Sequence, residues 1–223
     1  MKPYAYLHLA LVLLAASIFP LQAGSPPHRA GVTRVTVQDA VPFDTLIAYP
    51  TDAGEAPFQM GPFTIAGSRD AAMSPGGPFP VVLFSHGNGR RGGTSLPHRD
   101  LVASLAREGF IVIAPFHLGT SLPLEDRPKQ IRKVLDTVLA DGRFSTRANA
   151  ARVGMIGFSF GCAVSLIVAG AVPSLAHLSA YCRDRKDDPR ACDGVPTDVS
   201  SANGAHQRRA DGFAVKALVR RNL

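Results

Sequence analysis

Short apolar runs alternate with helical apolar stripes through the middle of the chain, and this alternation limits the fold more than any other feature. Residues 80–84, 110–113 and 153–156 are short, rich in β-branched side chains and flanked by Gly or Pro, as buried strands are. Residues 101–106 and 131–139 place apolar side chains at helical spacing. Such alternation builds a mostly parallel sheet with helices on both faces, so we predict an α/β fold.

The remaining segments are assigned by composition. Residues 172–212 are polar and without apolar periodicity, so we expect an irregular insert there. The chain after its leader then divides into N-terminal strands and loops at 24–80 and a core at 81–223. Further strands are predicted at 32–37, 45–49 and 214–219, and a further helix at 162–171. Residues 51–80 are rich in Gly, Pro and Asp and are predicted to be a loop with one strand near 63–65. The first turn of the 131–139 helix is predicted near Pro128.

The N-terminus has the pattern of an export signal. Lys2 precedes a mostly apolar run at 4–19, Pro20 ends the run, and Leu-Gln-Ala at 21–23 offers a small residue for cleavage. The run is shorter than the roughly 20 apolar residues that span a bilayer, so we expect no stable membrane span. We predict that residues 1–23 are removed and that the protein is periplasmic or secreted. A buried N-terminal helix is the alternative.

The three cysteines fit an oxidising compartment. Cys182 and Cys192 lie ten positions apart in a polar stretch rich in Arg and Asp, and we predict a disulfide between them. Closing so short a loop stabilises a fold by roughly 2–3 kcal/mol in the chain-entropy model. Cys162 sits in an apolar run and is predicted to be a buried small hydrophobe.

Charge and composition exclude several classes of partner. Lys and Arg number 24 against 17 Asp and Glu, a formal net charge of +7, but the basic residues are scattered and there is no Trp. We therefore expect no nucleic-acid partner. No two His, Asp or Glu residues share ligand spacing on one predicted element, so we expect no metal site.

The sequence Gly157-Phe158-Ser159-Phe160-Gly161 carries the chemistry. This G-x-S-x-G pattern follows a predicted strand and opens a predicted helix, which is the context of a nucleophile elbow. The tight turn forces a strained backbone at Ser159, and the flanking glycines allow close approach of neighbouring backbone. We predict that Ser159 is a nucleophile, with a structural turn that merely contains Ser as the alternative.

A second loop supplies the complementary feature. Acyl transfer needs two N–H donors aimed at the developing oxyanion. We predict the N–H of Phe160, after the nucleophile, and the N–H of Asn88, in the Ser-His-Gly-Asn-Gly loop after the first core strand. His86 is interpreted as structural, because it precedes the nucleophile and a base at that place in the chain is out of order.

These segments resemble the α/β-hydrolase superfamily, and more narrowly the secreted dienelactone hydrolase-like proteins and platelet-activating-factor acetylhydrolases. The resemblance covers residues 32–219 and implies hydrolysis of a small-molecule carboxylic ester by Ser159, without a metal or organic cofactor. Cys162 stands where the family usually has Gly, and Phe116 where it often has Asp. The matching segments are 81–89, 105–115 and 157–161, with 48–51, 61–63 and 69–71 nearer the N-terminus.

The rest of a catalytic triad is not found. In this fold the acid and then the His follow the nucleophile, but the strand at 214–219 is followed only by residues 220–223, which contain neither. His177 and His206 are interpreted as solvated loop residues, and His117 as part of the loop structure at the sheet edge. We expect a C-terminally truncated fold without its last strands and helix, and low or absent activity.

Three functions remain open at this point. The first is a serine ester hydrolase by family. The second is another acyl hydrolase, such as a lipase, polyesterase or peptidase, which the elbow alone does not distinguish. The third is a non-catalytic remnant or binding protein on the same fold, which the absent acid and base favour.

Overall fold

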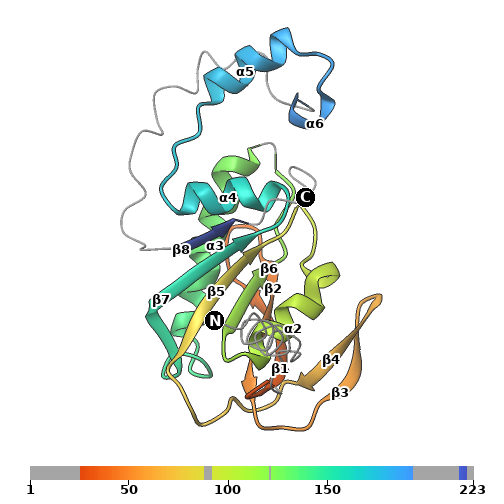
Figure 1. Ribbon diagram of the computed structural model, residues 1–223, viewed down its shortest axis with the longest axis vertical. Helices are drawn as coiled ribbons and strands as arrows, with labels where there is room; N and C mark the ends of the chain where they lie inside the picture. The colour runs from red at the N-terminus through yellow and green to blue at the C-terminus, as the bar shows by residue number, and fades with distance from the viewer. Residues whose placement is uncertain (1–25, 88–91, 121, 193–215, 220–223) are drawn as a thin grey trace, which may run out of the picture.

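One sheet runs through the part of the chain that the computed structural model describes, residues 26–87, 92–120, 122–192 and 216–219 (Figure 1). Its strands lie in the order β3-β4-β1-β2-β6-β5-β7-β8. The predicted signal at 1–23 lies outside the described residues. The strands are β1 Arg29–Val37, β2 Phe43–Thr51, β3 Ala56–Met60, β4 Phe63–Arg69, β5 Phe79–Ser85, β6 Ile111–Pro115, β7 Ala148–Gly157 and β8 Lys216–Val219. The helices are η1 Leu96–His98, α2 Arg99–Arg107, α3 Pro123–Ala140, α4 Phe160–Val168, α5 Leu175–Asp184 and α6 Pro189–Cys192.

The sheet has a parallel half and a largely antiparallel half. β5 pairs in parallel with β6 on one side and β7 on the other, and β8 continues parallel to β7. β2 is antiparallel to both β6 and β1. The predicted α/β class with a parallel core is confirmed. Because β5, β6 and β7 run the same way, the loops that follow them meet at one edge of the sheet, where ligands bind in such folds.

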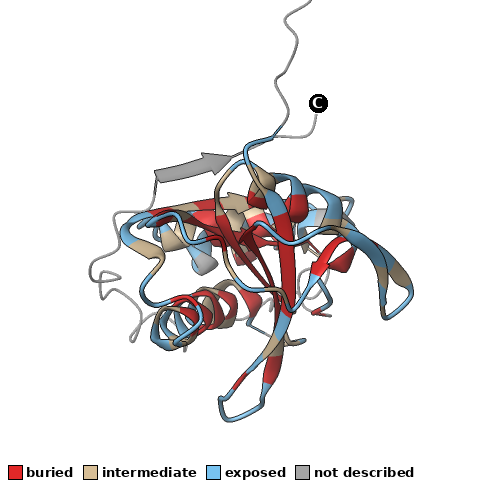
Figure 2. Ribbon diagram, turned by 90° about the horizontal axis from the view of Figure 1, so that it is seen from below, coloured by how far each residue is buried: buried red, intermediate tan, exposed pale blue. Residues whose placement is uncertain are grey.

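Side chains of the central strands alternate between two apolar layers. On β5, Val81 and Leu83 pack into one layer, whereas Val82 and Phe84 pack into the other. Helices α3 and α4 cover the first layer and α2 covers the second, so helices lie on both faces as predicted (Figure 1). Figure 2 shows buried residues concentrated along the strands between these helices. Each fully buried aliphatic side chain of this kind contributes about 1.5–3 kcal/mol.

The segment at 51–80 contains more strand than predicted. β3 and β4 pair as an antiparallel hairpin, and Gly61 takes a positive φ of 58° in the turn between them. Three of the five residues of β3 are exposed, and only Phe58 and Met60 pack on the core, so the apolar alternation is too short to mark a strand in the sequence. The prediction of one strand near 63–65 is corrected to a hairpin at the sheet edge.

Two helices begin earlier than predicted. Pro123 occupies the first turn of α3, where a missing N–H leaves no bond unmade, so Pro128 lies inside the helix rather than at its start. α4 begins at Phe160, directly after Ser159, and not at residue 162. The early start of α4 matters for the site, because it makes Ser159 the residue that precedes the helix.

The described part of the predicted irregular insert is mostly helical. α5 begins after Ser174, whose side chain accepts a hydrogen bond from the N–H of His177 and so caps the helix. In Figure 1, α5 and α6 lie beyond α4, away from the sheet. α5 is only ten residues long and is followed by a charged stretch, so the polar composition of the whole segment 172–212 predicts a loop there.

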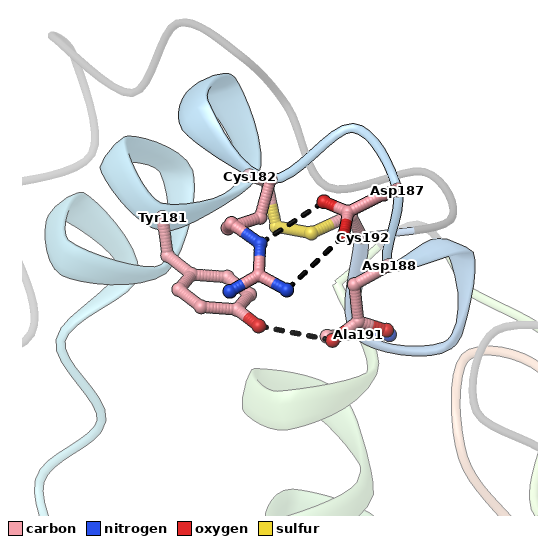
Figure 3. Close-up of a disulfide and its surroundings, with 7 residues drawn as sticks. Tyr181, Cys182, Asp187, Asp188, Ala191 and Cys192 are labelled. Atoms are coloured by element: carbon pink, nitrogen blue, oxygen red, sulfur yellow. Dashed lines mark hydrogen bonds and ion pairs between the residues drawn. A yellow bond between two sulfur atoms is a disulfide. The ribbon is translucent and has the colours of Figure 1, made fainter.

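Cys182 and Cys192, the predicted pair, form a disulfide that joins α5 to α6 (Figure 3). Their Cα atoms lie 5.3 Å apart. Within the loop that the disulfide closes, Arg185 donates two hydrogen bonds to the carboxylate of Asp187, at 3.0 and 3.1 Å. The connection between the two helices is therefore held covalently and by an exposed ion pair.

Reduction of this disulfide is expected to expose the connection to proteases. Trypsin cleaves after Arg185 or Lys186, and both residues are exposed within the closed loop. We expect Cys192→Ser to be cleaved there several-fold faster than wild type, because local opening no longer has to overcome the cross-link. Timed digestion with mass spectrometry measures this. Cys162→Ala, which keeps the cross-link, serves as the control, and equal rates in all three proteins would contradict the expectation.

Candidate active site

Ser159 stands at a strained turn between β7 and α4. Its backbone has φ +52° and ψ −121°. A non-glycine residue in such a conformation costs about 1–3 kcal/mol, and the conformation persists only where the surrounding structure imposes it. Ser159 is exposed, so the turn presents its hydroxyl to solvent at the carboxyl edge of the sheet. The structure thus places Ser159 at the position that the G-x-S-x-G pattern predicts.

The two elbow glycines, Gly157 and Gly161, let backbone segments pass unusually close. A Cβ on Gly157 would overlap the carbonyl group of Gly161, and a Cβ on Gly161 would overlap the carbonyl oxygen of Ser85 at the end of β5. The N–H of Phe158 donates to that same Ser85 oxygen at 2.9 Å. The turn is therefore held against β5 by backbone contacts that leave no room for side chains at the two glycines.

The first predicted oxyanion donor, Phe160, immediately follows Ser159. Within the described chain its N–H donates to no other residue, as expected for the first N–H of a helix. The N-terminus of α4 adds a partial positive charge at the same place. The loop after β5 also passes beside the nucleophile, because a Cβ on Gly87 would lie 3.1 Å from the Ser159 Cβ. The second predicted donor, Asn88, follows Gly87 and lies outside the described residues.

A chain of buried polar side chains lies behind this edge. The Oγ of Ser85 and Nε2 of His117 are 3.0 Å apart, and Nδ1 of His117 is 2.8 Å from Oε1 of Gln130. All three side chains are buried. Because an amide oxygen can only accept, Nδ1 of His117 carries the proton and Nε2 accepts from the Ser85 hydroxyl.

His86 is held in the same neutral form. Its Nδ1 donates to the carbonyl oxygen of Gly87 at 2.7 Å, and its Nε2 accepts the backbone N–H of His117 at 3.3 Å. Burial, reinforced by the charge of Arg127, lowers the pKa of His86 to about 4 and the pKa of His117 to about 3. Both imidazoles are therefore neutral at neutral pH, and they fasten the loop in place rather than exchange protons with a substrate.

The hydrogen-bonded side chains of Ser85, His117 and Gln130 are connected in the same order as a catalytic triad. They lack the accessible hydroxyl and the charged acid that a triad needs. The Ser85 residue is 0% exposed, so no substrate reaches its hydroxyl. An amide stands in the place of the acid and cannot stabilise an imidazolium ion by charge. We assign this chain a structural role under the site.

Among the described residues, no side chain hydrogen-bonds to the hydroxyl of Ser159. His177 is exposed on α5, and His206 lies outside the described residues. His98 packs against the ring of Phe158 with centroids 4.6 Å apart, and burial lowers its pKa. The described part of the site therefore contains an exposed serine at the predicted nucleophile position and, on Phe160, an N–H without a described acceptor. No described base contacts the serine hydroxyl.

Three residues of this region are not among the predicted ones, namely His98, Arg127 and Gln130. On α3, Arg127 and Gln130 share a face with Ile131 and Val134, at the spacing i, i+3, i+4 and i+7. Polar residues on an otherwise apolar stripe are the sequence signal that marks both as buried. No comparable pattern marks His98, which ends a single turn of 3₁₀ helix.

Neither a metal-binding cluster nor a membrane-spanning helix is found in the described ranges. No three side chains of His, Cys, Asp or Glu gather there in a way that could hold a metal ion. None of the helices in those ranges is both long and apolar enough to cross a bilayer. The predictions of no metal site and no stable membrane span apply to the whole chain and stay predictions.

The strand order, the elbow after β7 and the helices on both faces define an α/β-hydrolase fold. Among solved structures, the chain is similar to a ferulic acid esterase from Streptomyces cinnamoneus, with a TM-score of 0.54 and 19% identity over 68% of this chain and 57% of that one. No family model matches the chain, and no curated protein matches it by sequence. The similarity to the ferulic acid esterase shows a shared fold.

Two other solved structures are similar at lower TM-scores. A bacterial heroin esterase has a TM-score of 0.45 and 16% identity, over 81% of this chain and 46% of that one. A dienelactone hydrolase-like promiscuous phosphotriesterase, P91 from metagenomic libraries, has a TM-score of 0.41 and 17% identity, over 63% and 54%. The aligned region thus spans between 46% and 57% of the length of these three proteins. The predicted α/β-hydrolase fold is supported by the similarity to the ferulic acid esterase.

Adding a methyl group at the elbow is expected to disrupt the fold. In Gly161→Ala the new Cβ overlaps the Ser85 carbonyl oxygen, and backbone on both sides has to shift. We expect a loss of at least about 2 kcal/mol in the free energy of unfolding, at the upper range for overpacking. The control is Gly142→Ala, where nothing lies within 4 Å of the new Cβ. Urea unfolding of both variants measures the difference, and equal stabilities would refute the packing described for the elbow.

The buried imidazoles are expected to make the fold sensitive to acid. Because the folded-state pKa of His117 is depressed to about 3, the unfolded chain binds one more proton than the folded chain as pH falls below about 6.5. Stability is therefore lost with falling pH, by about 2 kcal/mol for this residue between pH 7.5 and 5.

The variant His117→Gln isolates this contribution. It removes the titrating group from both states, so its free energy of unfolding is expected to fall less steeply between pH 7.5 and 5 than that of wild type. Urea unfolding at several pH values measures both slopes. Parallel curves for the two proteins would mean that His117 is not buried in its neutral form.

Proposed function

We propose that this protein is a serine hydrolase of carboxylic esters that works through an acyl-enzyme on Ser159. One observation carries the proposal: a strained, exposed serine whose neighbour Phe160 keeps its N–H available beside it. The similarity in fold to a ferulic acid esterase supports an ester as the substrate class. The narrower proposal, on the resemblance of 81–89 and 105–115, is a dienelactone hydrolase-like or acetylhydrolase-like enzyme for small esters.

The proposed reaction has two balanced steps. The Oγ of Ser159 attacks the ester carbonyl carbon while its proton passes to a base, and the ester C–O bond then breaks as the alcohol leaves with a proton. Water attacks the acyl group on Ser159 in the second step and releases the carboxylic acid. The N–H groups of Phe160 and, as predicted, Asn88 stabilise the oxyanion in both steps, each at about 10²–10³ in rate.

One observation favours a second function. Within the described chain no His or carboxylate contacts the Ser159 hydroxyl, and a serine without a base stays protonated and weakly nucleophilic. The second candidate is accordingly a non-catalytic binding protein that keeps the fold and the elbow.

We further propose that the protein is exported, to the periplasm or the medium. The pattern at 1–23 motivates this proposal, and the disulfide between Cys182 and Cys192 supports it, since such bonds persist in oxidising compartments.

A fluorophosphonate probe separates the two candidate functions, because it reacts with serines that a base activates. The hydrolase function predicts that the wild-type protein is labelled at Ser159 and that Ser159→Ala remains unlabelled, with the site identified by peptide mass spectrometry. Hydrolysis of p-nitrophenyl acetate is expected to fall by about 10⁴–10⁶ in the variant. Ser165→Ala, which changes a buried serine on the same helix, is the matched control and keeps its labelling.

The contrary result is equally definite. If folded wild-type protein, verified by circular dichroism, is not labelled above the level of Ser159→Ala, the hydrolase proposal fails. The non-catalytic function is then the better account of the elbow.

A further inference from the structure

Arg127 is the largest fully buried side chain of the described molecule, and it lies beneath both halves of the candidate site. It projects from α3 with 0% exposure. Its Nη1 donates to the carbonyl oxygens of His86 at 2.9 Å and Gly87 at 3.1 Å. Its guanidinium carbon lies 5.3 Å from the ring centre of Phe160. One side chain therefore contacts the loop after β5 and the residue that follows the nucleophile.

Arg127 thus contacts the two segments from which the oxyanion donors are predicted to come, the loop after β5 and the start of α4. Phe160 supplies the available N–H beside Ser159. The His86 and Gly87 carbonyls directly precede the second donor that the sequence predicts. Gly87 also lies against Ser159, because a Cβ at Gly87 would lie 3.1 Å from the Ser159 Cβ. The two bonds from Arg127 therefore hold backbone that packs beside Ser159.

The electrostatic environment makes this arrangement expensive for stability alone. Burial lowers the pKa of Arg127 to about 10, which leaves it charged at neutral pH inside the protein. Taking a charge out of water costs free energy that its hydrogen bonds inside the protein only partly return, so a buried charge is weak evidence for a stabilising role. A buried guanidinium aimed at two loop carbonyls is therefore better explained by the geometry that it imposes than by the stability that it contributes.

We propose that Arg127 is a positioning residue that holds the oxyanion loop in register with the elbow, so that the reaction at Ser159 depends on a side chain that touches no substrate. This proposal rests on the proposed hydrolase function. It assigns to α3, through Arg127, the task of holding the backbone of His86 and Gly87 in place against Ser159 and Phe160.

The test compares labelling kinetics of Arg127→Lys and Arg127→Met with wild type. The Met side chain is similar in length to that of Arg and apolar, but it has no N–H donors. The Lys side chain provides a charged N–H donor but lacks the planar guanidinium group. Fluorophosphonate concentration series give the saturating rate constant, kinact, and the half-saturating concentration, KI. We expect kinact to fall about 10–100-fold in Arg127→Met and less in Arg127→Lys, with KI nearly unchanged, because misplaced donors slow the chemical step and not the encounter.

A matched control exists at the opposite end of β5. The Nη1 of Arg147 donates to two loop carbonyls as well, those of Ser74 at 3.0 Å and Gly76 at 3.2 Å. Arg147→Lys is expected to keep the wild-type kinact. Thermal unfolding of every variant reports stability separately, and kinact is expressed per folded molecule.

The outcomes distinguish this inference from the function on which it rests. The positioning role is supported if the wild type is labelled and kinact is lower in Arg127→Lys than in wild type, and lower still in Arg127→Met. Labelling of wild type with both Arg127 variants within about two-fold in kinact, whatever their stability, overturns the positioning role and leaves the hydrolase function standing. Absence of labelling in the wild type itself overturns the hydrolase function and the positioning role together.

Discussion

The carbonyl oxygen of Ser85 is the contact on which the candidate site depends. It accepts the N–H of Phe158, and Gly161 packs against it with no room for a side chain. The hydroxyl of the same residue donates to His117, one layer deeper. Ser85 thus joins the end of β5 to the elbow through its backbone and to the buried polar chain through its side chain. The strained backbone of Ser159 lies within the turn that these contacts hold against β5.

The carboxyl ends of parallel strands pose a problem of hydrogen bonding that this protein solves with side chains. Loop carbonyls such as those of His86 and Gly87 leave the sheet and lose their strand partners. Arg127 and the imidazole of His86 supply donors to them in the interior. Buried polar groups are costly when unpaired and rigid when paired, so this network turns a loop into a fixed support for the site.

Features of the fold and the site that depend on a few neighbouring residues could be predicted from the sequence, whereas contacts between distant segments could not. The runs that became β5, β6 and β7 are apolar and short, and the G-x-S-x-G pattern places Ser159 at the turn, so the parallel core and the elbow position follow from the sequence. β3 is not predicted because only Phe58 and Met60 alternate toward the core, which is too short a pattern to mark a strand. The bonds of Arg127 and Gln130 depend on helix α3 packing against loops far away in the chain. Their places on an apolar stripe indicate burial, but not the partners.

The two variable positions of the elbow, Phe158 and Phe160, differ in how readily they accept substitution. Phe158 contributes its N–H and C=O to the turn, which any residue except Pro can do, and it is 40% exposed, with its ring against the half-buried His98. Phe160 contributes its N–H but also packs its ring on Arg127. In the G-x-S-x-G pattern both positions are written as x, although their contacts differ. In a family of such chains, variation that tunes the surroundings of the nucleophile is expected to collect at the first x, whereas the second can change only together with α3.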